Sequence, residues 1–104
     1  MRKYEIYLPL RYNNGKTIEP TKISSICGEL AETFGAITVS PLSAPSQGRW
    51  KYGGVEYIDD ISKIEVVATR DRETKKFFID FKERLKTSLR QIDILITTHG
   101  IQVI

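Results

Sequence analysis

The chain has 104 residues, of which 40% are hydrophobic and 28% charged, and its formal net charge at pH 7 is +3. This length predicts a single domain, residues 1–104, and the composition excludes an intrinsically disordered chain. The net charge is far below that of a dedicated nucleic-acid binder, whose basic residues gather in a dense stripe. Weak binding to nucleic acid therefore stays open only as a minor alternative.

The sequence offers no sign of an oxidising compartment or of a membrane. Its one cysteine, Cys27, cannot form an intramolecular disulfide. Residues Met1–Glu5 lead directly into a strand pattern and leave no apolar segment of a signal peptide. No apolar run approaches the roughly 18 residues that a membrane span needs. We therefore expect a cytoplasmic protein without membrane contact.

The first third of the chain predicts a strand followed by a helix. Residues Lys3–Leu10 alternate apolar and polar side chains, as a strand with one buried face does. A helix is predicted over Pro20–Phe34, because proline is favoured in a first helical turn and Gly35 suits a left-handed C-terminal position. Cys27 falls on the apolar stripe of this helix, so we expect a buried structural thiol. Gly28 indicates a close approach of the helix to the sheet.

The rest of the chain predicts further strands and one long amphipathic helix. The expected strands are Ala36–Ser40, a hairpin around Gly53-Gly54 within Arg49–Tyr57, Ile61–Thr69 and Ile92–Thr98, with a helix over about Asp71–Gln91 and a bend at His99-Gly100. The resulting order, β-α-β-(β)-β-α-β, predicts an α+β, ferredoxin-like sandwich. Such a fold has an antiparallel sheet with two helices on one face.

The segment Pro41–Gly54 is rich in Pro, Ser, Gly and Gln, and it carries Arg49 and Trp50 near its end. A connection of this length inside a small domain is functional or mobile. Three hypotheses therefore remain for it: a lid folded over the open sheet face, an interface, or a mobile loop.

Catalytic and metal-binding motifs are absent from the sequence. His99 is the single histidine, and an exposed loop position is the commoner situation for such a residue than a general base. Asp59 and Asp60 are adjacent, so in a strand they point to opposite faces and cannot share a metal. Gly53-Gly54 lacks the surrounding motif of a phosphate loop. We expect no catalytic residue, no metal and no cofactor, and the balance is against an enzyme.

The open face of the predicted sheet is the better functional clue. It presents Tyr7, Val67 and Leu95 among polar groups, a mixed surface that is typical of a face covered by something. Base stacking on this platform, as in an RNA-recognition motif, is disfavoured because Glu65 would repel phosphate. The cations of the second helix are interleaved with acids, and an acidic protein partner could use only its C-terminal half, including Arg90.

Four spaced stretches together resemble a group of small, uncharacterised bacterial proteins of about this length. They are Tyr4–Leu10, Phe34–Val39, Gly48–Trp50 through Gly54–Tyr57, and Leu89–Leu95. The resemblance implies a compact ferredoxin-like domain that forms oligomers, and it carries no activity. Within and beside these stretches, the candidates for ligand or partner binding are Arg49, Trp50, Tyr57, His99, Arg90 and Gln91.

The leading hypothesis is a non-enzymatic binding or regulatory accessory domain that acts through protein–protein contact, first through its own homodimerisation. Its interface is expected near Tyr7, Val67 and Leu95. One alternative is a small-molecule enzyme of the dimeric α+β-barrel type, with a pocket between sheet and helices and Trp50, Tyr57 and His99 at its rim. Another is weak nucleic-acid binding through cations of the second helix.

Overall fold

The computed structural model describes residues 1–41 and 45–104. Its elements are β1 (Arg2–Pro9), α1 (Pro20–Phe34), β2 (Thr38–Val39), β3 (Ser46–Tyr52), β4 (Val55–Ala68), α2 (Arg72–Ser88) and β5 (Leu95–Gly100). This order confirms the predicted ferredoxin-like α+β arrangement. Residues 42–44 of the Pro41–Gly54 segment lie outside the described part of the chain.

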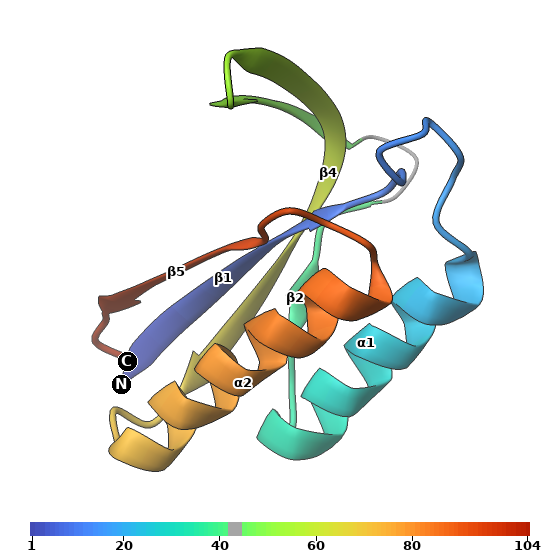
Figure 1. Cartoon of the computed structure of the whole chain (residues 1–104). Helices are drawn as coiled ribbons and strands as arrows, with labels where there is room; N and C mark the ends of the chain where they lie inside the picture. The colour runs from blue at the N-terminus through green and yellow to red at the C-terminus, as the bar shows by residue number, and fades with distance from the viewer. Residues whose placement is uncertain (42–44) are drawn as a thin grey trace.

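The strands form one antiparallel sheet in which β4 pairs with β1, β2 and β3. The order is β2-β4-β1-β5, and β3 pairs with the remaining part of β4. Both helices lie on the same face of this sheet, and the hairpin of β3 and β4 extends beyond the part that they cover (Figure 1). The register places Ile6 opposite Ile64 on β4 and Ile96 on β5, so the apolar positions share the helix-covered face.

The core lies between this face and the helices. Tyr4 stacks on Phe78 with ring centroids 4.0 Å apart, and Phe81 is 1% exposed. Strict alternation with the predicted open-face residues Tyr7, Val67 and Leu95 puts the following side chains toward the helices, and all are buried or packed against the core: Tyr4, Ile6, Leu8, Ile64, Val66, Ile94 and Ile96. The predicted division of the sheet into a covered and an open face is therefore correct for these positions.

The helix ends follow their local sequence. α1 starts at Pro20 as predicted, and Gly35 follows it with φ 88° while its N–H donates to the Ala31 carbonyl. Asp71 caps α2 by accepting a 2.7 Å hydrogen bond from the backbone N–H of Thr74. α2 ends at Ser88, earlier than the predicted Gln91, because Arg90 adopts φ 51° and turns the chain.

Several sequence predictions need correction. The predicted hairpin strand and the strand Ile61–Thr69 are parts of one uninterrupted 14-residue strand, β4. β5 starts at Leu95 instead of Ile92, because the Asp93 carboxylate accepts from the Ile94 N–H and turns the chain there. It continues through Gly100, so there is no bend at His99-Gly100. Gly28 has open space beside it and does not mark a close approach to the sheet.

Replacing Phe81 by Ala should lower the free energy of unfolding by roughly 3–5 kcal/mol, through lost burial and the cavity left behind. Urea denaturation measures the change. Ile79→Ala is the matched control, because Ile79 lies on the same helix but is 56% exposed. Equal, small losses for both variants would mean that α2 does not pack as described.

Candidate functional site

The long strand β4 serves two different parts of the molecule. From Ile61 onward it pairs with β1, whereas Val55–Ile61 pairs with β3. The hairpin turn at Gly53-Gly54 has positive φ at both residues, as the predicted tight turn requires. The β3–β4 hairpin therefore extends the sheet as a two-stranded arm, and no helix covers this arm in Figure 1.

Strand alternation gives the arm an inner side that continues the open face of the sheet. On β4 this side carries Tyr57, Asp59 and Ile61, in line with Lys63. Across the pair it carries Trp50, opposite Tyr57, and the two rings stack with centroids 4.4 Å apart. We use the term inner face of the hairpin for Gly48, Trp50, Tyr57, Asp59 and Ile61.

The glycine at position 48 leaves room on this inner face for the Ile61 side chain. A β-carbon at Gly48 would overlap the Cδ1 atom of Ile61, which packs across the glycine from the neighbouring strand. The Ile61 side chain therefore fills the space that a side chain at position 48 would take.

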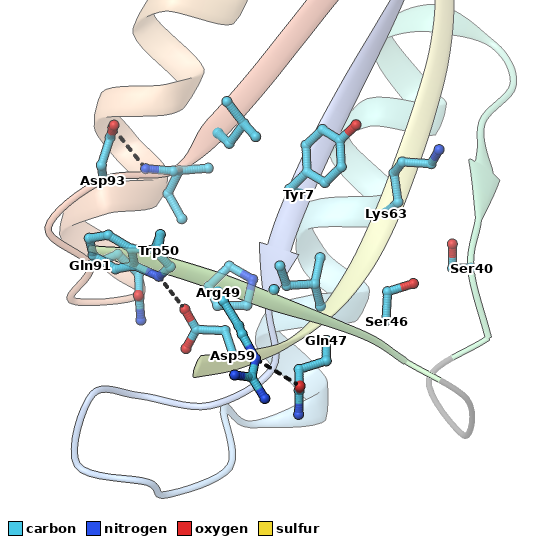
Figure 2. Close-up of a pocket in the computed structure, with 15 residues that line it drawn as sticks. Tyr7, Ser40, Ser46, Gln47, Arg49, Trp50, Asp59, Lys63, Gln91 and Asp93 are labelled. Atoms are coloured by element: carbon cyan, nitrogen blue, oxygen red, sulfur yellow. Dashed lines mark hydrogen bonds between the residues drawn. The ribbon is translucent and has the colours of Figure 1, made fainter. Parts of the chain in front are cut away.

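A groove of about 530 Å³ lies between the inner face of the hairpin and the open face of the sheet. Its lining includes Tyr7, Trp50, Ile61, Gln91, Asp93 and Leu95. Figure 2 shows that Trp50, Gln91 and Asp93 lie toward one end, and Ser40, Ser46 and Lys63 toward the other. The volume is within the range of small-molecule sites, about 300–1,000 Å³.

Two carboxylates at the Trp50 end have different partners. Asp59 accepts a 2.8 Å hydrogen bond from the indole Nε1–H of Trp50 and has no ion-pair partner among the described residues. Asp93 lies 3.2 Å from the Lys82 ammonium. Burial opposes its ionisation, but hydrogen bonds from Lys82 and from the Ile94 N–H outweigh burial and lower its pKa. Asp93 is therefore compensated within the chain, and Asp59 is not.

Gln91 contributes an acceptor to the same end of the groove. The side chain is only 8% exposed, and its amide nitrogen donates to the carbonyls of Leu89 at 3.0 Å and Arg11 at 3.4 Å. These donations fix the orientation of the amide. The remaining polar atom, Oε1, has no hydrogen bond from the described residues and belongs to a side chain that lines the groove.

The middle of the open sheet face carries a charge network that is neutral in sum. Lys63 lies 3.2 Å from Glu65 and 3.9 Å from Glu5, and Lys3 lies 3.3 Å from Glu65. The hydrogen bonds from Lys63 and Lys3 lower the pKa of Glu65, and the bond to Glu65 together with Glu5 raises that of Lys63. The stability that ionised Glu65 contributes is thus fully present above the pKa that this residue has in the unfolded chain. It is lost as the pH falls through the lower pKa of the folded state.

The structure brings some of the predicted site residues together and separates others. Arg49, Trp50, Gln91, Tyr7 and Leu95 all line the groove. Tyr57 supports Trp50 from one side without entering the lining. The predicted lid or loop is in large part the strand β3, which forms one wall.

The remaining predicted residues lie elsewhere. The Arg90 guanidinium lies over the Tyr12 ring, 5.7 Å from its centroid. His99 lies on β5 opposite Lys3, near the N-terminal end of β1. Val67 is on the open face but outside the groove, also opposite Lys3. Neither Arg90 nor His99 lines the groove beside Trp50.

Sequence reasoning missed Asp59 and Asp93 as groove residues. Asp59 could have been found, because the Gly53-Gly54 turn sets the register that puts it beside Trp50. The position of Asp93 in the groove depends on where β5 starts, and the alternating pattern predicts that start wrongly. Over residues 1–41 and 45–104 there is no group of three or more His, Cys, Asp or Glu that could hold a metal. Nor is any helix there long and apolar enough to cross a membrane.

No protein-family model matches the chain, and no curated protein sequence matches it. Two solved structures are similar. A phage SAM lyase in complex with S-methyl-5'-thioadenosine has a TM-score of 0.68 at 9% identity, over 95% of this chain and 80% of that one. A divalent cation tolerance protein, CutA1, from Thermus thermophilus has a TM-score of 0.62 at 17% identity, over 97% and 84%. These similarities establish the shared small ferredoxin-like α+β fold, and they support the resemblance stated from sequence at that level only.

Two glycine substitutions should change stability in opposite directions. Gly48→Ala should lower the free energy of unfolding by about 1 kcal/mol, because the new methyl group forces the terminal methyl group of Ile61 to move. Gly28→Ala, with open space in mid-helix, should raise it by about 0.5–1 kcal/mol. Thermal and urea unfolding measure both. A neutral Gly48→Ala would show that the Ile61 side chain does not pack over Gly48 as described.

Proposed function

We propose that this protein is a non-enzymatic binding domain that acts through self-association, with the inner face of the hairpin and the open sheet face as its interface. The supporting observation is the apolar side of an arm that has no core of its own chain beneath it. Tyr52 and Val55 at the arm's tip are 59% and 53% exposed, and Leu95 on the sheet is 57% exposed. Burying apolar area of this kind against another surface is favourable in free energy.

A second copy of the chain suits this surface better than a strongly charged partner. The central network of Lys3, Glu5, Lys63 and Glu65 is compensated within one chain, so covering it leaves no unpaired charge. A two-fold axis lets one such patch meet its own copy, which makes a homodimer the expected form. We also propose that residues 1–104 act as one domain in the cytoplasm.

Binding through the cations in and just after the C-terminal half of α2 has less support. Arg84 makes a bidentate contact with Glu29 on α1, and Lys86 lies 3.4 Å from Glu83. Arg90 is occupied by the Tyr12 ring. Cations that are already paired attract an acidic protein or nucleic acid only weakly, so we rank these two partners below self-association.

A small-molecule site is the second candidate, and the groove beside Trp50 favours it. The groove lies on the open face, not between the sheet and the helices where the enzyme hypothesis placed its pocket. His99 is outside it, so the groove lacks the one residue that was considered as a general base. One structure of the same fold holds a small ligand, S-methyl-5'-thioadenosine, and this supports binding without assigning a reaction.

The wild-type protein should be a homodimer in solution, with twice the chain mass of 11.9 kDa by light scattering at high micromolar concentration. Val67→Lys and Leu95→Lys should each shift it toward monomer, because they place like charges near the two-fold axis. Circular dichroism should show unchanged helix content.

Ile79→Lys is the matched control, since Ile79 is as exposed as Leu95 but lies on α2, on the other side of the molecule. It should leave the mass unchanged. A wild-type monomer would contradict the proposal. A dimer that Val67→Lys and Leu95→Lys leave intact would place the interface elsewhere.

A further inference from the structure

The indole of Trp50 is held in place at one end of the groove. Tyr57 covers one of its faces, and the Nε1–H is committed to Asp59 at 2.8 Å. Trp50 is half-buried and lines the groove, so its remaining surface is available there. An aromatic face fixed in this way attracts cations through its π-electrons, and indole is the best of the side chains at doing so.

The polar groups of Asp59 and Gln91 that can still form hydrogen bonds at this end are acceptors. The two donors closest to them, the Trp50 indole N–H and the Gln91 amide, already have partners. Gln91 Oε1 and the Asp59 carboxylate remain able to accept. A ligand that fits must therefore supply hydrogen-bond donors, and one without donors would leave the Gln91 oxygen unpaired.

The charge at this end is negative. Asp59 has no ion-pair partner among the described residues, whereas Lys82 compensates Asp93. Arg49 also lines the groove, but Glu56 compensates its charge. Its guanidinium lies 3.6 Å from the Glu56 carboxylate, and its Nε–H donates to Gln47. Lys63 belongs to the other end and to the neutral network (Figure 2).

From these three features we infer that the Trp50 end of the groove binds a small organic cation with a flat head group that carries N–H donors. Amidinium, guanidinium and protonated amino-heteroaromatic groups belong to this class. The head group lies against the indole, Asp59 provides the opposite charge, and Gln91 Oε1 accepts a hydrogen bond. A carboxylate or phosphate ligand meets an uncompensated aspartate and no free donor from Trp50 or Gln91. The inference does not rest on self-association, because all of these groups belong to one chain.

The chain's single tryptophan makes the site directly observable. Benzamidine, protonated at neutral pH, serves as the cationic probe, with benzamide and benzoate as neutral and anionic probes of nearly the same shape. Trp50 fluorescence and the indole N–H signal in NMR follow each titration. We expect a saturable response to benzamidine with a Kd on the order of 1 mM, as for fragment-sized ligands, and roughly tenfold weaker binding of the other two.

Asp59→Asn tests the charge while keeping an oxygen that can accept from Trp50. It should weaken benzamidine binding roughly tenfold, a loss that is typical of a charged hydrogen-bond partner. Asp60→Asn is the matched control, since it removes a carboxylate from the same strand on the side facing away from Asp59, and its partner Arg11 does not line the groove. It should leave the Kd unchanged, and unfolding curves confirm that both variants fold.

The inference is overturned if no probe gives a saturable response, if benzoate or benzamide binds as well as benzamidine, or if Asp59→Asn and Asp60→Asn behave alike. The titration is repeated with Val67→Lys, whose substitution lies outside the groove. Binding by this variant as a monomer upholds the ligand site whatever the outcome for self-association. Loss of binding in this variant alone overturns a site formed by one chain.

Discussion

The continuity of β4 is the constraint on which both the fold and the site depend. This strand pairs with β1 and β2 over its second half and with β3 over its first. Because side chains alternate strictly along a strand, one register fixes both faces at once. Ile64 and Val66 point toward the helices, and therefore Tyr57, Asp59 and Ile61 point to the other side. A slip by one residue would expose the core and remove the groove together.

This shared register also explains why the open face is not uniform. Near the middle of the sheet, the open-face positions of β1 and β4 are charged and compensate one another within the chain. Toward the hairpin they become aromatic and aliphatic, and Asp59 is the carboxylate among them without an ion-pair partner in the described structure. The face therefore has a neutral polar middle, an apolar arm and one local negative charge. The proposed self-association relies on the neutral middle and the apolar arm, and the proposed recognition of a cation relies on the apolar arm and the negative charge.

The sequence was a good guide where a single periodicity dominates. Alternation in β1 and the stripe of α2 predicted which residues form the core, and Gly53-Gly54 predicted the hairpin turn. It was a poor guide where polar residues interrupt a strand. Asp59, Asp60 and Ser62 made β4 look like two strands, yet the Trp50 indole, Arg11 and the Ser40 carbonyl satisfy these three side chains.

The end of α2 shows a second limit of sequence reasoning. Arg90 adopts φ 51°, a conformation that sequence would assign to glycine or asparagine. The Gln91 N–H then bonds to the Lys86 carbonyl, and the Gln91 side chain turns back toward Leu89 and Arg11. Gln91 was chosen as a candidate from resemblance alone. What places it in the groove is the helix ending, which no pattern in the chain indicates.

The two proposed activities share residues, and this has a thermodynamic consequence. Tyr7 and Leu95 line the groove and also belong to the open face assigned to self-association. A second copy on that face lies beside the mouth of the groove and changes the surroundings of a bound cation. By linkage, if dimerisation alters the affinity for the cation by some factor, cation binding must alter the dimerisation constant by the same factor. A dimer that covers the mouth strengthens cation binding if it closes around the ligand, and weakens it if its own side chains fill the groove. The sign of this coupling therefore distinguishes a groove completed by the partner from one that the partner occupies.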